Sequence, residues 1–389
     1  MTKSKTARHP ISDFMPELIR LRRELHAHPE PSDNEQKTAA ILTEFMRQFR
    51  PDEVIAPLGS NGVAFVFDSG RPGPTVVFRC ELDAIPVEEK NDFAFRSRIP
   101  GLAHKCGHDG HMAIMAGFGH LLSLNRPQKG RIILHFQPAE ETGQGAAAVV
   151  DDQKFKNLNP DYAFALHNLP GYPLGAILLK SGTINCASRG MIIRLIGITS
   201  HSAWPEDGLS PAEPMCDLIR DLAGLPATSR LNQFFCKVTV GHARLGDAAF
   251  GLSPGYAEVM ATLRSETDAA MSILVERALN LVKEKATESN LNYEIGWEEE
   301  FIASSNDPGA CDIVKKAGMA AGAEVIDFKE ALPVSEDFGQ FTARIPGAMF
   351  FLGAGEDCPG LHQADYDFPE ELIQIGSNVF MQIAQILVY

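Results

Sequence analysis

The sequence has few of the features that mark secreted, membrane-spanning or nucleic-acid-binding proteins. Its seven cysteines are odd in number and scattered through 389 positions, which favours reduced thiols in a cytoplasm over a disulfide framework. The N-terminal segment is basic, but neither an apolar run nor a small-residue cleavage site follows it, so we expect no signal peptide. No stretch approaches the roughly 18 apolar residues needed to span a bilayer. We therefore expect a cytoplasmic protein without a membrane partner.

Positive charge is also in short supply, since 35 Lys and Arg residues stand against 50 Asp and Glu residues, giving a net charge of -15. A surface this acidic repels phosphate backbones and anionic lipids, so we expect no nucleic-acid partner. The sequence also lacks a Gly-x-Ser-x-Gly motif, a phosphate-binding glycine loop and a dinucleotide-binding motif. These absences argue against three large classes of enzyme. They leave open a small-molecule substrate, because a local pocket can oppose the global charge.

The pattern of expected elements indicates an α/β protein. Strand-like and helical runs alternate in the first half of the chain, which is typical of a mostly parallel sheet flanked by helices. Ligands of such sheets lie at the C-terminal ends of the strands. We expect helices at residues 11–28, 35–49, 111–124, 307–321 and 369–388, and strands at residues 62–67, 75–79, 131–136, 161–167 and 347–353.

A second pattern begins near Cys186, and the length of the chain is itself too great for one ordinary core. Strands are expected at 190–197, 234–243, 256–265 and 292–297, with helices at 210–225 and 269–285. The resulting order, βαββαβ, is the ferredoxin-like arrangement. We therefore expect an inserted domain at 186–298, and a discontinuous catalytic, metal-binding domain made of residues 1–185 and 299–389.

The densest group of chemically active side chains is the run from His104 to His111. In it, Cys106 and His108 stand two residues apart, a spacing that lets a thiolate and an imidazole reach one metal ion or two adjacent ions. Two alternatives remain at this point. The run could be a helix start capped by Asp109 with incidental histidines, or Cys106 could be a nucleophile paired with a histidine.

Further metal-binding side chains follow other strand-like runs. Glu140 and Glu141 come directly after the run that ends at Phe136. Paired glutamates are common on solvated surfaces, but a dinuclear hydrolase needs one carboxylate to bind metal and another to take a proton from metal-activated water. His167 and His362 would each, alone, more often be hydrogen-bonded residues than ligands. Together these residues give a plausible ligand set, which comprises Cys106, His108, Glu141, His167 and His362, and Asp83 could orient one of them.

With these residues assembled, the chain resembles the amidohydrolases that include hippurate hydrolase, N-acyl-amino-acid aminoacylases and plant auxin-conjugate hydrolases. They belong to the dinuclear metallopeptidases of clan MH. The resemblance runs nearly end to end. The segments that carry it are Leu21–Glu30, Cys106–His111, Phe136–Glu141, Leu166-His167 and Leu361–Phe368.

The resemblance implies a site for two divalent metal ions per subunit, which could be zinc, manganese, cobalt or nickel. Cys106 would take the place of a bridging carboxylate, with His108, Glu141, His167 and His362 as the other ligands. Glu140 would be the general base. His104, Asp109 and His111 match the motif without being standard ligands, so we expect them to support the ligands.

The inserted domain would then be a lid and a dimerisation domain. Residues 199–205 resemble the family segment whose first histidine reaches the partner subunit's active site, so the resemblance gives His201 the role of stabilising the oxyanion and implies a homodimer. The chain departs from the family at Ser200, Ser202 and Glu206, and at residues 251–254 and 79–83. These departures put the substrate contacts of the lid in question, but not the ligands.

The implied reaction is hydrolysis of N-acyl amino acids, such as N-acetyl or N-benzoyl conjugates, to a carboxylic acid and a free amino acid. Within the enzyme class, a dipeptidase or carboxypeptidase would use the same metals and base. A catalytically silent relative that binds acylated amino acids is a second alternative, and a purely structural zinc site is a third. Structural zinc sites are closed arrangements of four ligands, whereas five candidate ligands and a further glutamate favour an open catalytic site.

Overall fold

The computed structural model describes residues 11–227 and 235–389, and in it the chain divides into two compact units. The larger unit consists of Met1–Ile184, Ser305–Glu330 and Asp337–Tyr389, and the smaller of Asn185–Ser304 and Ala331–Glu336. The N-terminal segment considered for a signal peptide, and the expected strand start at Phe234, lie outside the described residues.

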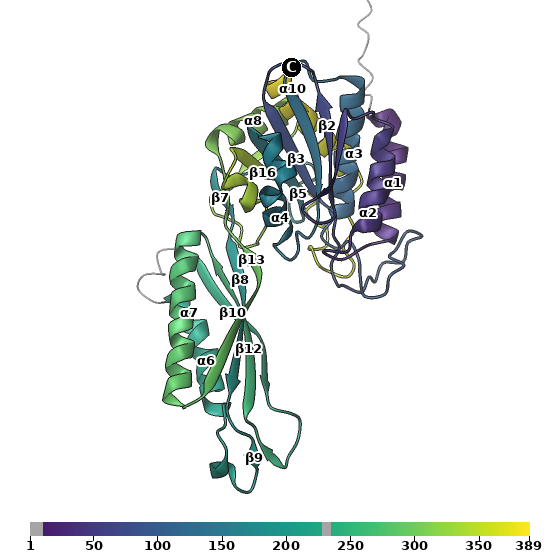
Figure 1. The fold of residues 1–389 in the computed structure, drawn as a ribbon. Helices are drawn as coiled ribbons and strands as arrows, with labels where there is room; N and C mark the ends of the chain where they lie inside the picture. Colours follow the sequence, from purple (N-terminus) through teal and green to yellow (C-terminus); the bar gives the residue numbers. More distant parts are fainter. Residues whose placement is uncertain (1–10, 228–234) are drawn as a thin grey trace, which may run out of the picture. The chain divides into compact units, whose positions relative to one another are not determined.

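An eight-stranded sheet forms the centre of the larger unit, in the order β1-β2-β4-β3-β5-β16-β6-β15 (Figure 1). The strands are β1 (Glu53–Leu58), β2 (Gly62–Asp68), β3 (Thr75–Glu81), β4 (Arg131–Gln137), β5 (Tyr162–Leu169), β6 (Ile177–Leu179), β15 (Val325–Asp327) and β16 (Gly347–Gly353). The four central strands β4, β3, β5 and β16 run parallel to one another. Antiparallel pairing joins β1 to β2, β2 to β4 and β6 to β16. The sheet is therefore mixed and mostly parallel, as expected.

Helices complete the larger unit. They are η1 (Ser12–Phe14), α1 (Met15–Ala27), α2 (Gln36–Arg47), α3 (His108–Leu124), α4 (Gly145–Asp151), α5 (Gln153–Leu158), α8 (Pro308–Ala320), α9 (Gly339–Thr342) and α10 (Glu371–Val388). Helix α3 packs against α1, α10 and β3, and it is apolar on nearly every side, as a fully buried helix should be. Phe78 of β3 meets Phe118 of α3 with ring centroids 4.7 Å apart. The core therefore holds α3, and the motif at its start, firmly in place.

The smaller unit has the predicted ferredoxin-like topology. Its antiparallel sheet has the order β10-β12-β8-β13, and two helices pack on it. The elements are β8 (Ala187–Ile196), α6 (Ala212–Gly224), β10 (Cys236–Leu245), β12 (Tyr256–Ser265), α7 (Asp268–Glu288) and β13 (Asn292–Phe301). The smaller unit also contains β9 (Ser200–His201), which pairs with β11 (Leu252–Ser253), and the 3-10 turns η2 (Pro205–Asp207) and η3 (Leu225–Ala227). The short strands β7 (Gly182–Asn185) and β14 (Ser304–Asn306), most of whose residues belong to the larger unit, pair with each other.

The edges of the smaller unit differ slightly from the expected 186–298. Strand β13 continues to Phe301 instead of ending at Trp297, which carries the unit to Ser304. Residues 331–336 also belong to it, because the main-chain N–H of Cys186 donates to the carbonyl oxygens of Leu332 and Val334.

Helix α10 qualifies the expectation that no stretch approaches membrane-spanning length. Among the described residues it is the one helix long and apolar enough to cross a membrane on length and composition alone. Ten of its residues are buried, and it packs against α3 and α8. Such burial is typical of a core helix.

Candidate metal centre

The candidate residues lie where the central strands of the larger unit end. Asp83 comes two residues after β3, and the pair Glu140 and Glu141 follows β4. His167 lies near the C-terminal end of β5. Because β3, β4 and β5 are parallel neighbours, their carboxyl ends meet at one edge of the sheet. The first turn of α3 brings His108 to the same place.

Backbone turns of unusual conformation aim these side chains. Gly107, directly before α3, has φ 98°, and a Cβ there would lie 2.4 Å from the side-chain oxygen of Asn168. Glycine alone meets both conditions without strain. Ala139 and His362 have φ values of 50° and 66°, which is uncommon for residues other than glycine. Such outliers cluster at functional sites, where the surrounding structure holds them.

The ligand atoms form two groups of three that share one cysteine. In the first group, the ligand atoms of Cys106, His108 and His167 lie within 4.8 Å of one another. In the second, those of Cys106, Glu141 and His362 do so as well. The structure thus brings together all five ligands expected from the sequence, with the Cys106 thiol common to both groups. We call these the inner group and the outer group, because His108 and His167 are buried whereas the His362 side chain is 54% exposed.

Hydrogen bonds prepare the two inner histidines for metal binding. His108 Nδ1 donates to the main-chain oxygen of Asp83 at 2.8 Å, and His167 Nδ1 donates to that of Asn168 at 2.8 Å. Each bond leaves Nε2 to face the centre, as in metal sites whose ligands are oriented by neighbouring acceptors. His108 Nε2 is buried and has no hydrogen-bond partner among the described residues, while Glu140 and Glu141 oxygens lie 3.9 and 3.8 Å away. A metal ion would satisfy this nitrogen, and the thiol, imidazole and carboxylate donors suit one.

The pKa directions of His167, His362 and Cys106 fit the same assignment, whereas Asp83 and nearby carboxylates outweigh burial and raise the pKa of His108 to about 10, so a metal ion would have to displace its proton. Burial lowers the pKa of His167 well below its usual value, and His111 lowers it further. Burial also lowers the pKa of His362, so both rings are neutral and able to coordinate. Burial raises the pKa of the Cys106 thiol, and the carboxylates of Glu141 and Glu140 raise it further, so only a bound cation would make it a thiolate at neutral pH.

Asp83 contacts both the candidate ligand His108 and the turn that carries Glu140 and Glu141. Its Oδ1 lies 3.4 Å from His108 Nδ1, and its Oδ2 accepts from the main-chain N–H of Glu141 at 3.0 Å and from Ser32 at 2.7 Å. Glu35 supports the same turn, since its Oε1 accepts from the N–H of Ala139 at 2.8 Å. Glu140 is 5% exposed, within reach of the inner group.

A buried ionic network ties α1 to the start of α3, and sequence reasoning did not find it. Arg22 is fully buried and donates to Asp109 Oδ2 at 2.7 Å, and His26 Nδ1 lies 2.8 Å from the same oxygen. His26 Nε2 and Lys105 Nζ both reach Glu89 Oε1, at 3.0 and 2.6 Å. Asp109 is therefore a buried anion held by Arg22 and His26. In the sequence, the basic residues of segment 21–30 stood out only as part of the family resemblance, and nothing indicated their contacts with Asp109 and Glu89.

The two other motif histidines have different surroundings. His111 Nδ1 lies 2.7 Å from Glu81 Oε2, and its Nε2 lies 2.6 Å from Asn168 Oδ1. His104 is also buried, but neither of its ring nitrogens has a hydrogen-bond partner among the described residues. Burial lowers the pKa of His104 to about 3, so this ring is neutral. His111 thus contacts Asn168, the neighbour of His167, whereas the hydrogen bonds of Asp109 go to Arg22 and His26, and those of His104 are absent among the described residues.

His201 lies in the smaller unit, apart in the sequence from the five ligands of the larger one. It is in β9, where it pairs with Leu252 of β11, and its ring is exposed beside Trp204 at 5.1 Å between centroids. The altered segments 199–205 and 251–254 are therefore neighbours within this unit. The role expected for His201 remains a prediction.

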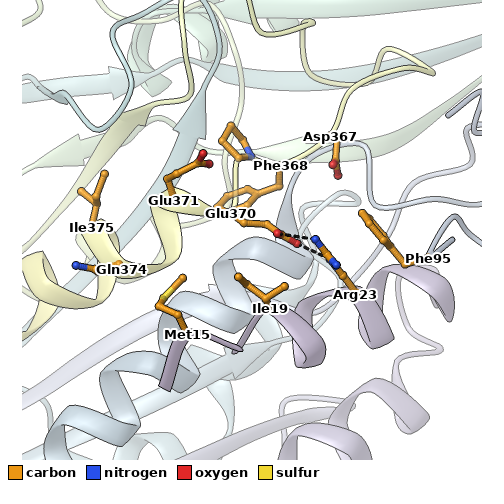
Figure 2. Close-up of a pocket in the computed structure, with 11 residues that line it drawn as sticks. Met15, Ile19, Arg23, Phe95, Asp367, Phe368, Glu370, Glu371, Gln374 and Ile375 are labelled. Atoms are coloured by element: carbon orange, nitrogen blue, oxygen red, sulfur yellow. Dashed lines mark hydrogen bonds and ion pairs between the residues drawn. The ribbon is translucent and has the colours of Figure 1, made fainter. Parts of the chain in front are cut away.

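A separate surface cavity of about 680 Å³ lies between α1 and the start of α10 (Figure 2). Figure 2 shows Arg23 reaching across to Glu370, and the two hydrogen bonds measure 2.8 and 2.9 Å. Asp367 and Glu370 line the cavity and also contact Arg22. None of the five candidate ligands lines it, so this cavity is distinct from the metal centre.

Known proteins share this chain's sequence and fold. The model of peptidase family M20/M25/M40 matches residues 77–386. The N-acetyldiaminopimelate deacetylase of Lactobacillus helveticus is 30% identical over 93% of this chain and 95% of its own length. The N-acetyl-L-cysteine deacetylase of Bacillus subtilis is 29% identical over 91% and 84%. The crystal structure of a dinuclear metal-binding M20 peptidase from Bacillus subtilis superposes with a TM-score of 0.80 at 25% identity, covering 97% of this chain and 99% of the other. The chain therefore belongs to the M20/M25/M40 family of metal-dependent hydrolases, which act on amide bonds.

Proposed function

We propose that this protein binds two divalent metal ions per subunit and hydrolyses the amide bond of N-acyl amino acids. The observation that carries the proposal is the pair of ligand groups that share the Cys106 thiol, with Glu140 next to them. Two of the similar proteins are deacetylases of N-acetylated amino acids, which supports an acyl amino acid as the substrate. Zinc, manganese, cobalt and nickel all suit the mixed donor set.

The protein groups have separate tasks in the proposed reaction. Metal ions in the two groups would polarise the scissile carbonyl and acidify a water molecule. Glu140 takes a proton from that water at a carboxylate oxygen and later gives it to the leaving amine nitrogen. Asp83 keeps His108 in the tautomer whose Nε2 faces the centre, and it also fixes the glutamate turn through the N–H of Glu141. The products are a carboxylic acid and a free amino acid.

A homodimer formed through the smaller unit belongs to the same proposal. Trp204, Phe250 and Leu252 are large apolar residues near β9 and β11, and all three are exposed. Apolar side chains gathered in this way often mark an interaction surface. In the dimer, His201 would reach the partner's active site and stabilise the oxyanion. Light scattering should give twice the chain mass of 42.4 kDa, and a monomer at micromolar concentration would refute this part.

Elemental analysis followed by a substrate panel tests the function. The panel contains N-acetyl and N-benzoyl amino acids, dipeptides, and the same compounds as methyl esters of the carboxylate. We expect two ions per chain and metal-dependent release of free amino acid from the N-acyl compounds. Faster cleavage of dipeptides would instead identify a dipeptidase or carboxypeptidase. If the metal-loaded protein hydrolysed none of the compounds, it would be a catalytically silent binding protein.

A further inference from the structure

His111 is buried between two partners and lies outside both ligand groups. Its Nδ1 lies 2.7 Å from Glu81 Oε2, and its Nε2 lies 2.6 Å from Asn168 Oδ1. His111 is 1% exposed, and Glu81 and Asn168 are fully buried. Nε2 also lies 3.2 Å from the main-chain nitrogen of Asn168, so it can accept that N–H while Nδ1 donates to the Glu81 carboxylate. Both ring nitrogens of His111 therefore have protein partners, although the ligand atoms of Glu81, His108 and His111 also lie within 4.8 Å of one another.

Asn168 connects His111 to the proposed ligand His167. Its main-chain oxygen accepts from His167 Nδ1 at 2.8 Å, and its side-chain amide donates to Tyr366 Oη at 2.6 Å. The His111 and His167 rings also pack edge to face, with centroids 4.6 Å apart. A displaced Asn168 would move the acceptor that orients the His167 ring. The close approach of Gly107 to the Asn168 side chain leaves that amide little other space.

Salt bridges behind Glu81 anchor the chain of contacts in the sheet. Arg79 contacts Glu81 and places Nη2 2.6 Å from Asp337 Oδ1, and all three side chains are at most 1% exposed. Breaking a buried pair of this kind costs more than breaking an exposed one, because a charge is left without compensation. The contacts that lead from Glu81 to His167 therefore start from a buried ion pair within the core.

The outer group is held by different contacts. The main-chain N–H of His362 donates to the oxygen of Lys105 at 2.8 Å, and that of Glu141 donates to Asp83. Its histidine is more than half exposed, whereas the inner histidines are buried. Asp83 thus supports His108 of the inner group as well as Glu141 of the outer group, so the contacts particular to the inner group are those around His167.

From these contacts we infer that His111 and Glu81 are positioning residues that act through Asn168 on His167, and so set the affinity of the inner metal ion alone. This inference rests on the proposed function, because it requires two metal ions. Partners of this kind usually change metal affinity by about 10- to 100-fold when they are removed. We therefore expect His111→Ala and Asn168→Ala to lower the affinity for one of the two ions by that factor and to leave the affinity for the other unchanged.

The experiment titrates metal-free protein with zinc(II) alone, against a competing chelator dye, and counts bound ions by elemental analysis. His120→Ala is the matched control, since His120 lies farther along α3 and stacks on Phe14. His362→Ala identifies the outer ion. Thermal unfolding of each variant without metal shows that the fold is kept. If His111→Ala does not fold, His111→Gln and Asn168→Ala carry the same test.

A double-mutant cycle separates positioning from ligation. If His111 acts through His167, His111→Ala will have no further effect on zinc affinity in a His167→Ala background, but will add to the loss in His362→Ala. The inference would be overturned if His111→Ala bound each of the two ions with the same affinity as the wild type. Normal binding by Asn168→Ala together with loss in His111→Ala would also overturn it, since His111 would then be a ligand itself. A wild-type protein that binds fewer than two ions would instead overturn the proposed function.

Discussion

Cys106 Sγ lies 3.4 Å from His167 Nε2, although the two residues are 61 positions apart in the sequence. One precedes helix α3 and the other belongs to strand β5, so only the packing of α3 on the sheet brings them together. The same sulfur is within 4.8 Å of the ligand atoms of Glu141 and His362. One thiol is therefore placed to join two metal ions.

Replacing Cys106 should weaken the binding of both metal ions. In Cys106→Ser the hydroxyl stays protonated where a metal-bound thiol loses its proton, so neither ligand group keeps its shared anion. Elemental analysis after dialysis should find less than about one ion per chain, against two in the wild type. Cys311→Ser is the control, because Cys311 is another buried cysteine, in α8. Two ions retained by Cys106→Ser would refute the shared ligand.

Replacing Glu140 should slow the reaction without emptying the site. Glu140→Gln removes the proton acceptor but keeps the size of the side chain, so kcat should fall by about 10²- to 10⁴-fold while two ions remain bound. Glu141→Gln, its neighbour in the sequence, should instead lower metal content. The pair is compared by elemental analysis and initial rates on one N-acyl amino acid. Near-normal turnover by metal-loaded Glu140→Gln would disprove the role of Glu140 as base.

Metal binding should release protons near neutral pH. Burial raises the pKa of Cys106, and the hydrogen bond to Asp83 and the nearby carboxylates outweigh burial to raise the pKa of His108 to about 10. Both groups are therefore protonated in the metal-free protein at pH 7, and a metal ion must displace those protons. Metal affinity should rise with pH across the range below about 10. Calorimetry in two buffers of different ionisation enthalpy should give on the order of two protons per chain, and buffer-independent heats would contradict this.

Acid should destabilise the larger unit through Glu89. Hydrogen bonds from His26, Lys105 and the N–H of Ser97 outweigh burial and lower the pKa of Glu89 to about 2. Because the folded pKa lies below the unfolded value, the stabilisation is complete above pH 4.5 and is lost as pH falls toward 2.

The variant Glu89→Gln tests that assignment. It should flatten the decline of the free energy of unfolding between pH 4.5 and 2. At pH 7 it should cost about 3 kcal/mol, because Lys105 is left buried without its counter-charge. Denaturant unfolding at several pH values measures both effects. Glu88→Gln is the control, since Glu88 is the exposed neighbour of Glu89. A decline as steep as that of the wild type would show that other groups govern acid stability.

Much of the fold followed from the spacing of apolar residues. Strands β12 and β16 have the expected bounds, and the ferredoxin-like order of the smaller unit is confirmed. Strand β1 was missed because it is an exposed edge strand that contains Pro57 and has no alternation of buried and exposed residues. Strands β6 and β15 were missed because three residues are too few to show a period. Helix α3 begins at His108 instead of His111, since the turn at Gly107 completes the loop earlier.

The candidate ligands could be picked out from the sequence because each lies in a motif, whereas the residues that contact them could not. Glu81 and Asn168 stand beside Asp83 and His167 in the sequence, but nothing in their spacing indicates that both meet His111. The network of Arg22, Asp109 and Glu89 likewise depends on how α1 packs against α3. Contacts of this kind follow from tertiary structure, and a single sequence does not carry their signal.

The place of β16 in the sheet sets an order of events during synthesis. This strand lies between β5 and β6 at the middle of the sheet, yet its residues are translated only after the whole smaller unit. A nascent chain that ends before Gly347 therefore leaves the edge of β5 unpaired, beside His167. His362 leaves the ribosome later still, so the proposed outer ligand group is complete only after the strands of the sheet have been made.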